Sequence, residues 1–174
     1  MHGRIFVIVD EDSLKNGDRF CPFVAADMVD WIPGCEYVVK ESERDFKESL
    51  NWLSECLNFD LKIEFKDLDG KKVLVGTISQ DGVKGLIQAI EEEKKIRLRA
   101  IREELKKENP DMWRIAYLAY NNNTFYFVLP QGEFSNEMDF LKSLRQFQKE
   151  YNGSLFITES YGYQLSKFVI KTTE

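Results

Sequence analysis

Apolar residues recur along the chain with periods that predict strands and helices in alternation. Residues 5–9 form an uninterrupted apolar run, typical of a strand covered on both faces, so a strand is expected over residues 3–10. Residues 11–34 predict a long irregular segment with a short helix near residues 24–31, because Pro22, Pro33 and Gly34 interrupt it. A short strand at residues 37–39 and a helix capped by Ser42 follow.

The helix that starts at Ser42 has an apolar face with spacings of four, three and four, formed by Phe46, Leu50, Leu53 and Leu57. Alternation over residues 61–66 and a turn sequence at residues 67–70 then predict a β-hairpin that returns over residues 73–75. The second half shows the same plan, with a strand at 125–129, a helix capped by Ser135 or Asn136, a strand from 155, a turn at 161–163 and a return strand at 168–170. The sequence therefore predicts an internal βαββ repeat at about 36–78 and 124–172.

A long helix over residues 82–108 joins the two repeats, with Asp81 as its cap and Asn109-Pro110 as its stop. Residues 112–120 fit either a strand or a helix, and the alternation of Trp113 with its neighbours favours the strand. With that strand, residues 36–120 have the ferredoxin-like order βαββαβ. We therefore expect one α+β domain, residues 1–174: this order with an added βαββ repeat, in a mostly antiparallel sheet packed against helices that include the long helix 82–108.

Composition agrees with a folded protein. The chain has 174 residues, 43% of them hydrophobic, and thirteen are Phe, which is enough to bury a core without cross-links. Its three cysteines are scattered and lack a CxxC spacing, which favours reduced thiols in the cytoplasm. No apolar run is long enough for a membrane span or a signal peptide.

Charge and motif content exclude several functional classes. Residues 1–87 hold 17 Asp/Glu and 11 Lys/Arg, whereas residues 88–174 are balanced, and this acid excess argues against a general nucleic-acid binder. The only histidine is His2, which leaves no imidazole for the usual Ser-His-Asp or Cys-His machinery or for a His-rich zinc site. The sequence also lacks the GxGxxG and GxxxxGK[ST] motifs.

Two acids spaced by one residue follow the first predicted strand. Residues 8–14, with Asp10 and Asp12, resemble the opening motif of haloacid-dehalogenase-type phosphatases. The resemblance implies Asp10 as a nucleophile and Asp12 as a proton donor beside a magnesium ion. It covers seven residues, no paired-acid motif follows downstream, and the predicted hairpins depart from that fold's alternating order. We therefore do not assign the chain to that family.

A related metal hypothesis uses the predicted hairpin turn. In palm-type nucleotidyl transferases and cyclases, acids from the first strand and a nearby hairpin hold two metals, and Asp10 or Asp12 with Asp67 and Asp69 resemble such a set. Carboxylate oxygens are the ligands that Mg²⁺ prefers. The same Asp-Leu-Asp-Gly sequence is also typical of an ordinary turn. A Mg²⁺-dependent enzyme acting on phosphate esters or nucleotides therefore stays an alternative.

The predicted long helix carries a basic ridge, formed by Lys95, Arg99, Arg102 and Lys106. Such a ridge can contact an acidic protein face or phosphates. Several aromatic residues are not readily placed in one core: Trp31, Trp52, Trp113, Tyr117, Tyr120, Tyr161 and Tyr163. Since Tyr161 and Tyr163 fall in a predicted turn, they are expected to be surface contacts.

These features favour a non-enzymatic binding or regulatory protein that acts through a protein–protein interface and needs no cofactor. Its predicted anchors are Tyr161, Tyr163 and the helix 82–108. The partner is another protein, with a homodimer as one form of this prediction. A nucleic-acid module that uses the basic ridge is a further alternative.

Overall fold

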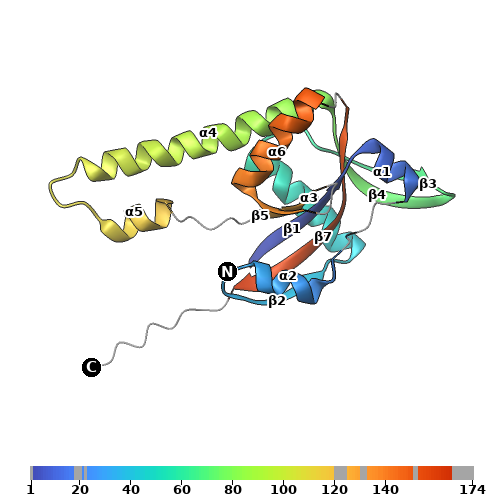
Figure 1. Ribbon diagram of the computed structural model, residues 1–174, viewed down its shortest axis with the longest axis horizontal. Coiled ribbons are helices and arrows are strands. Elements are labelled where there is room, and N and C mark those ends of the chain that lie inside the picture. The colour runs from blue at the N-terminus through green and yellow to red at the C-terminus, as the bar shows by residue number, and fades with distance from the viewer. Residues whose placement is uncertain are drawn as a thin grey trace.

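The computed structural model describes residues 2–17, 21, 23–119, 125–129, 133–150 and 153–165 (Figure 1). These residues contain seven strands and six helices. The strands are β1 His2–Val9, β2 Cys35–Lys40, β3 Lys62–Leu68, β4 Lys71–Ile78, β5 Phe125–Val128, β6 Phe134–Asn136 and β7 Leu155–Leu165. The helices are α1 Glu11–Asn16, α2 Ala25–Trp31, α3 Glu43–Leu57, α4 Gln80–Leu105, α5 Met112–Ala119 and α6 Glu137–Glu150.

The strands form one sheet ordered β3-β4-β7-β1-β5-β6, and β2 also pairs with β7. Strands β1 and β5 run parallel, while the other described pairs are antiparallel. Strand β7 organises the sheet because one edge pairs with β1 along most of its length. Its other edge pairs with β4 through residues 155–157 and with β2 through residues 161–165. The fold is therefore α+β, with a mostly antiparallel sheet.

Strand β1 contributes side chains to both sides of the sheet. Phe6 and Ile8 belong to the largest buried cluster, which includes residues of α3, α4 and α6. Ile5 and Val7 face the other side, where residues of α2 and β2 complete a second cluster. Residues 5–9 are each at most 3% exposed. This burial confirms the prediction of a strand covered on both faces.

Local sequence signals place several elements correctly. The Ser42 side chain accepts a hydrogen bond from the Asp45 N–H (3.2 Å) and caps α3 as predicted. The β3–β4 hairpin turns through Asp69 and Gly70, whose φ angles of 55° and 74° are left-handed. The long helix is also confirmed, although Ser79 rather than Asp81 caps it. Its cap accepts the Gly82 N–H at 3.0 Å.

Residues 112–119 form helix α5, so the prediction of a strand over residues 112–120 is wrong. Asp111 caps this helix, since its Oδ1 accepts hydrogen bonds from the N–H groups of Trp113 (3.0 Å) and Arg114 (3.1 Å). A side-chain cap satisfies amides that lack partners at a helix start, and this local gain prevails over the alternating pattern. The ferredoxin-like order expected for residues 36–120 is not confirmed, because its last strand is this helix.

Strand β7 runs without interruption through residues 161–163, where a turn was predicted. Gly162 pairs with Arg4 of β1 on one side and with Val39 of β2 on the other. Partners on both edges keep the backbone extended despite the Tyr-Gly-Tyr sequence. The second βαββ repeat is therefore not confirmed, and its predicted return strand at residues 168–170 lies outside the described residues.

Candidate functional site

Helix α4 has a buried first part and a projecting second part. Its first part packs into the main core through Val83, Leu86, Ile87 and Ile90. Beyond Ile90, Glu104 is the one buried residue in the helix. Figure 1 shows the distal part extending away from the sheet, with α5 folded back near its end. We call residues 94–119 the arm.

Glu104 holds the turn of the arm in place. Its carboxylate, 4% exposed, accepts hydrogen bonds from Lys107 Nζ (2.7 Å) and the Asp111 N–H (3.1 Å), and Arg114 Nε lies 3.6 Å away. Because Lys107 and the Asp111 N–H stabilise the ionised form, the pKa of Glu104 is lowered. The carboxylate thus joins the end of α4 to the start of α5.

Exposed apolar side chains concentrate on the arm. Eleven large apolar side chains are exposed within the described residues, and six lie here: Ile96, Leu98, Leu105, Met112, Trp113 and Tyr117. Trp113 is 83% exposed, and α5 has no buried residue. Clustered apolar exposure marks interaction sites, and Trp and Tyr are frequent at the centres of interfaces. The arm therefore has the surface chemistry of a docking element.

The predicted basic ridge lies along the same arm and comprises Lys95, Arg99, Arg102 and Lys106. A shallow hollow on α4 places Leu98 among three of these residues. Arg99 Nη2 lies 2.8 Å from Glu92 Oε1, while no ion pair of Arg102 is found in the described part of the chain. The arm contains eight Lys/Arg and four Asp/Glu, so its net charge is +4. Three glutamates, Glu91, Glu92 and Glu93, immediately precede it, and Glu92 lines the same hollow. Leu98 therefore shares one surface with Lys95, Arg99 and Arg102.

Tyr161 and Tyr163 do not lie on the surface, so their predicted exposure is wrong. They are 6% and 3% exposed, because the continuous strand β7 carries both into the core beside α2 and β2. The Tyr161 hydroxyl donates to Glu159 (3.3 Å), and burial raises the pKa of this phenol. Neither ring is available as a surface anchor in this fold.

The acids of the metal hypothesis lie at the end of β1 and in the β3–β4 hairpin. Asp10 caps α1, a helix that the sequence did not predict, and its Oδ1 accepts the Ser13 N–H at 2.7 Å. Asp12 lies in the first turn of α1, Asp67 is opposite Lys72, and Asp69 is in the left-handed turn. Over the described residues, no three His, Cys, Asp or Glu side chains are grouped to hold a metal ion. The Mg²⁺ site stays a prediction without an assembled ligand set.

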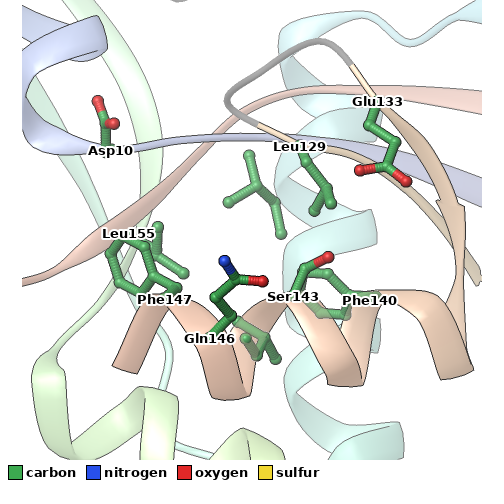
Figure 2. A pocket seen from close by; sticks show the side chains of 10 residues that line it. Asp10, Leu129, Glu133, Phe140, Ser143, Gln146, Phe147 and Leu155 are labelled. Carbon is green, nitrogen blue, oxygen red and sulfur yellow. The ribbon is translucent and has the colours of Figure 1, made fainter. Parts of the chain in front are cut away.

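A cavity of about 500 Å³ lies where the carboxyl ends of β1 and β5 meet α6 (Figure 2). Its apolar lining is formed by Ile8, Leu129, Phe140, Leu144, Phe147 and Leu155, and its polar lining by Asp10, Glu133, Ser143 and Gln146. Figure 2 shows the Gln146 amide directed into the space between the apolar side chains. The volume is that of small-molecule sites, which often lie at the carboxyl ends of parallel strands, and the lining is apolar and polar in similar measure. The cavity is therefore a candidate site for a small molecule that has both apolar and polar groups.

A groove of about 580 Å³ separates β2 from α3. Tyr37 and Val39 on the β2 side are 45% and 56% exposed, whereas Asp45 and Glu48 are exposed on the α3 side. At its base, the half-buried Glu41 accepts from Arg4 Nε (2.7 Å) and the Ser49 hydroxyl (2.6 Å). The groove thus has an internally paired base, a β2 wall that carries Lys40 beside the apolar side chains, and an acidic α3 wall.

These features define an α+β protein with a projecting, partly apolar helical arm and a groove on its body that has one acidic wall. No family model, curated protein or solved structure matches the chain. Across the described residues, no helix combines the length and the apolar character needed to cross a membrane.

Sequence reasoning found part of this arm and missed part of it. Trp113 and Tyr117 were recognised as aromatic residues that do not fit a core, but they were placed on a strand. Glu104 was overlooked. Its signal was an acid at the end of a helix, with Lys107 just before the Asn109-Pro110 stop and Arg114 just after it.

Proposed function

We propose that this protein binds another protein through its arm and acts as a non-enzymatic binding or regulatory protein. The observation that supports the proposal is the exposed apolar surface of α4 and α5, above all the 83% exposure of Trp113. Removing apolar surface from water contributes about 25 cal/mol per Å² to association. Covering Trp113 and its neighbours is therefore the main expected source of affinity.

The charge of the arm indicates the chemistry of its partner. A net charge of +4 over residues 94–119 favours a partner surface with an acidic rim around an apolar centre. Such complementarity accelerates association and selects among partners, while the apolar centre supplies most of the affinity.

The arrangement of the ridge favours a protein partner over a nucleic acid. Glu92 lies beside both Lys95 (3.8 Å) and Arg99 (2.8 Å), and Glu103 pairs with Lys106 (2.6 Å). These acids reduce the positive field that a phosphate backbone requires. The exposed leucine and tryptophan side chains gain little from phosphate contacts.

Site-specific photo-cross-linking tests this proposal. A photoreactive residue replaces Trp113 in one variant and the similarly large, exposed Phe65 of β3 in a control, and the cross-linked proteins are identified by mass spectrometry. We expect a partner that cross-links from position 113 and not from position 65. The purified partner should bind the Trp113→Ala variant about 30-fold more weakly, as for a tryptophan at an interface centre. Equal cross-linking from both positions, or unchanged affinity of Trp113→Ala, would exclude the arm as the binding surface.

A further inference from the structure

We infer that the partner is a second copy of this chain and that the arm of each copy docks in the β2–α3 groove of the other. This inference rests on the proposed function, because it identifies the partner of the same arm. Its surfaces are residues 94–119 on one copy and the groove lined by Tyr37, Val39, Asp45 and Glu48 on the other.

The distribution of charge favours pairing between the arm and the body. The arm carries a net charge of +4, and the remainder of the chain carries −10. Residues 35–57, which form β2 and α3, contain six Asp/Glu and three Lys/Arg, a net charge of −3. Two arms packed together would place like charges in contact, which is unfavourable. Placing an arm on the β2–α3 region brings opposite charges together instead.

The two surfaces also match in the placement of their charges. Arg99 and Arg102 are three residues apart on α4, and Asp45 and Glu48 are three residues apart on α3. Residues with this spacing are neighbours on a helix surface, about 5–6 Å apart. Each helix therefore presents two like charges one turn apart, and all four side chains belong to exposed residues.

Apolar groups lie next to both charge pairs. On the arm, Leu98 shares a hollow with Arg99 and Arg102. In the groove, Tyr37 and Val39 form the exposed apolar wall opposite Asp45 and Glu48. Docking would cover apolar surface on both copies while the arginines meet the carboxylates. Docking would replace existing ion pairs such as that of Arg44 with Glu48 (3.3 Å). The side chains of this pair are 85% and 66% exposed, so the pair contributes little and opposes docking only weakly.

Reciprocal docking produces a closed assembly. Helix α4 is one continuous helix that carries the arm away from the body (Figure 1), so the arm does not fold onto the groove of its own chain. If each copy supplies one arm and one groove, a two-fold axis satisfies both contacts at once. If only one arm docked in the partner's groove, one arm and one groove would stay uncovered, and further copies could add to them.

A charge exchange between the two surfaces tests the inference by sedimentation velocity. One variant carries Arg99→Glu and Arg102→Glu, and the other carries Asp45→Lys and Glu48→Lys. We expect the native chain to dimerise and each variant alone to dimerise at least about tenfold more weakly, because both of its contacts then join like charges. The equimolar mixture should recover the native affinity, since each arm then meets a groove of opposite charge. Circular dichroism and thermal unfolding establish that both variants are folded.

The controls separate this inference from the proposed function. Lys71→Glu/Lys72→Glu reverses two exposed charges at the β3–β4 turn, and this variant should dimerise like the native chain. Specific dimer interfaces usually have a Kd well below about 100 μM. A native chain that stays monomeric at a protein concentration of about 100 μM would therefore overturn self-association. A cross-linked partner other than this chain at position 113 would then still support the proposed function. Docking in the groove would be overturned by either of two results. In one, the arm variant dimerises more weakly but the groove variant dimerises like the native chain. In the other, the equimolar mixture does not recover the native dimer affinity.

Discussion

At the scale of single residues, Gly3 shows how tightly β1 and β7 approach each other. Gly3 is opposite Tyr163 in the sheet, and a Cβ atom at position 3 would lie 2.1 Å from the Tyr163 Cζ. The ring is 3% exposed and in edge contact with Tyr126, at 5.7 Å between centroids, so it has little room to move. The requirement for glycine here is steric.

Gly3→Ala is expected to destabilise the protein by about 1–3 kcal/mol, the usual effect of overpacking a core. Urea unfolding measures the change. Gly85→Ala is the matched control, because nothing lies within 4 Å of its added methyl group and it is inside α4. That substitution should stabilise the protein by about 0.5–1 kcal/mol, as expected for alanine in a helix. Equal effects of both substitutions would contradict the steric argument.

At the scale of elements, the arm is a helical hairpin whose two helices are joined at the turn by the Glu104 carboxylate. Helix α5 has eight residues, too few to be stable alone in water. It is held by its Asp111 cap and by the contacts of Glu104 with Lys107 and Asp111. Helix α5 also packs against α4, with Ile115, Ala116 and Leu118 half-buried, but it has no fully buried residue. The contacts at the turn therefore supplement a thin packing surface.

The hairpin should therefore loosen in acid. A carboxyl group with a lowered pKa stabilises the fold fully above its ordinary pKa of about 4.5. That contribution is lost as the pH falls from there through the lowered value. Over this range the protection of the amides of residues 111–119 should fall, where protection is the ratio of the exchange rate of an unfolded chain at the same pH to the measured rate. Glu104→Gln should show this lower protection already at neutral pH.

Glu103→Gln is the matched control for that experiment. Glu103 is exposed, and among the described residues its ion pair is with Lys106, the residue that caps the end of α4. Its neutralisation should leave the exchange of α5 nearly unchanged, as expected for a surface ion pair. If the two variants behave alike, the turn is not held by Glu104.

At the scale of the whole molecule, the body carries the negative charge and the arm carries positive charge. The proposed dimer would join these regions, and salt screens attraction between exposed charges, with a Debye length near 10 Å at 0.1 M. Apolar burial is far less sensitive to moderate salt.

The dimer should accordingly weaken, without dissociating completely, as NaCl is raised from about 0.05 to 0.5 M. Sedimentation equilibrium at several concentrations gives the dissociation constant at each salt concentration. Trp113→Ala should weaken the dimer by a similar factor at the low and the high NaCl concentration, because this substitution removes an apolar contact. Affinity of the native chain that is independent of salt would contradict the charge pairing.

Local pattern was enough to predict much of the fold. The buried run of β1, the Ser42 cap of α3, the β3–β4 hairpin and the length of α4 were all readable in sequence. The Asn136 cap of α6 was one of the two predicted, and its Oδ1 accepts the Asp139 N–H at 3.0 Å. Each of these signals depends on residues within a few positions of each other, so the backbone geometry of one element is sufficient to reveal it.

Tertiary structure decided the rest. Only pairing with β1 and β2 on both edges shows that Gly162 continues a strand, and only that strand carries Tyr161 and Tyr163 into the core. The sequence located the basic ridge and indicated that Trp113 does not fit a core. The exposure of Trp113, however, depends on where the arm leaves the body. The sequence by itself determined periods, caps and charges. Burial and exposure were decided by contacts between residues far apart in the chain, because local periodicity does not record which faces the rest of the molecule covers.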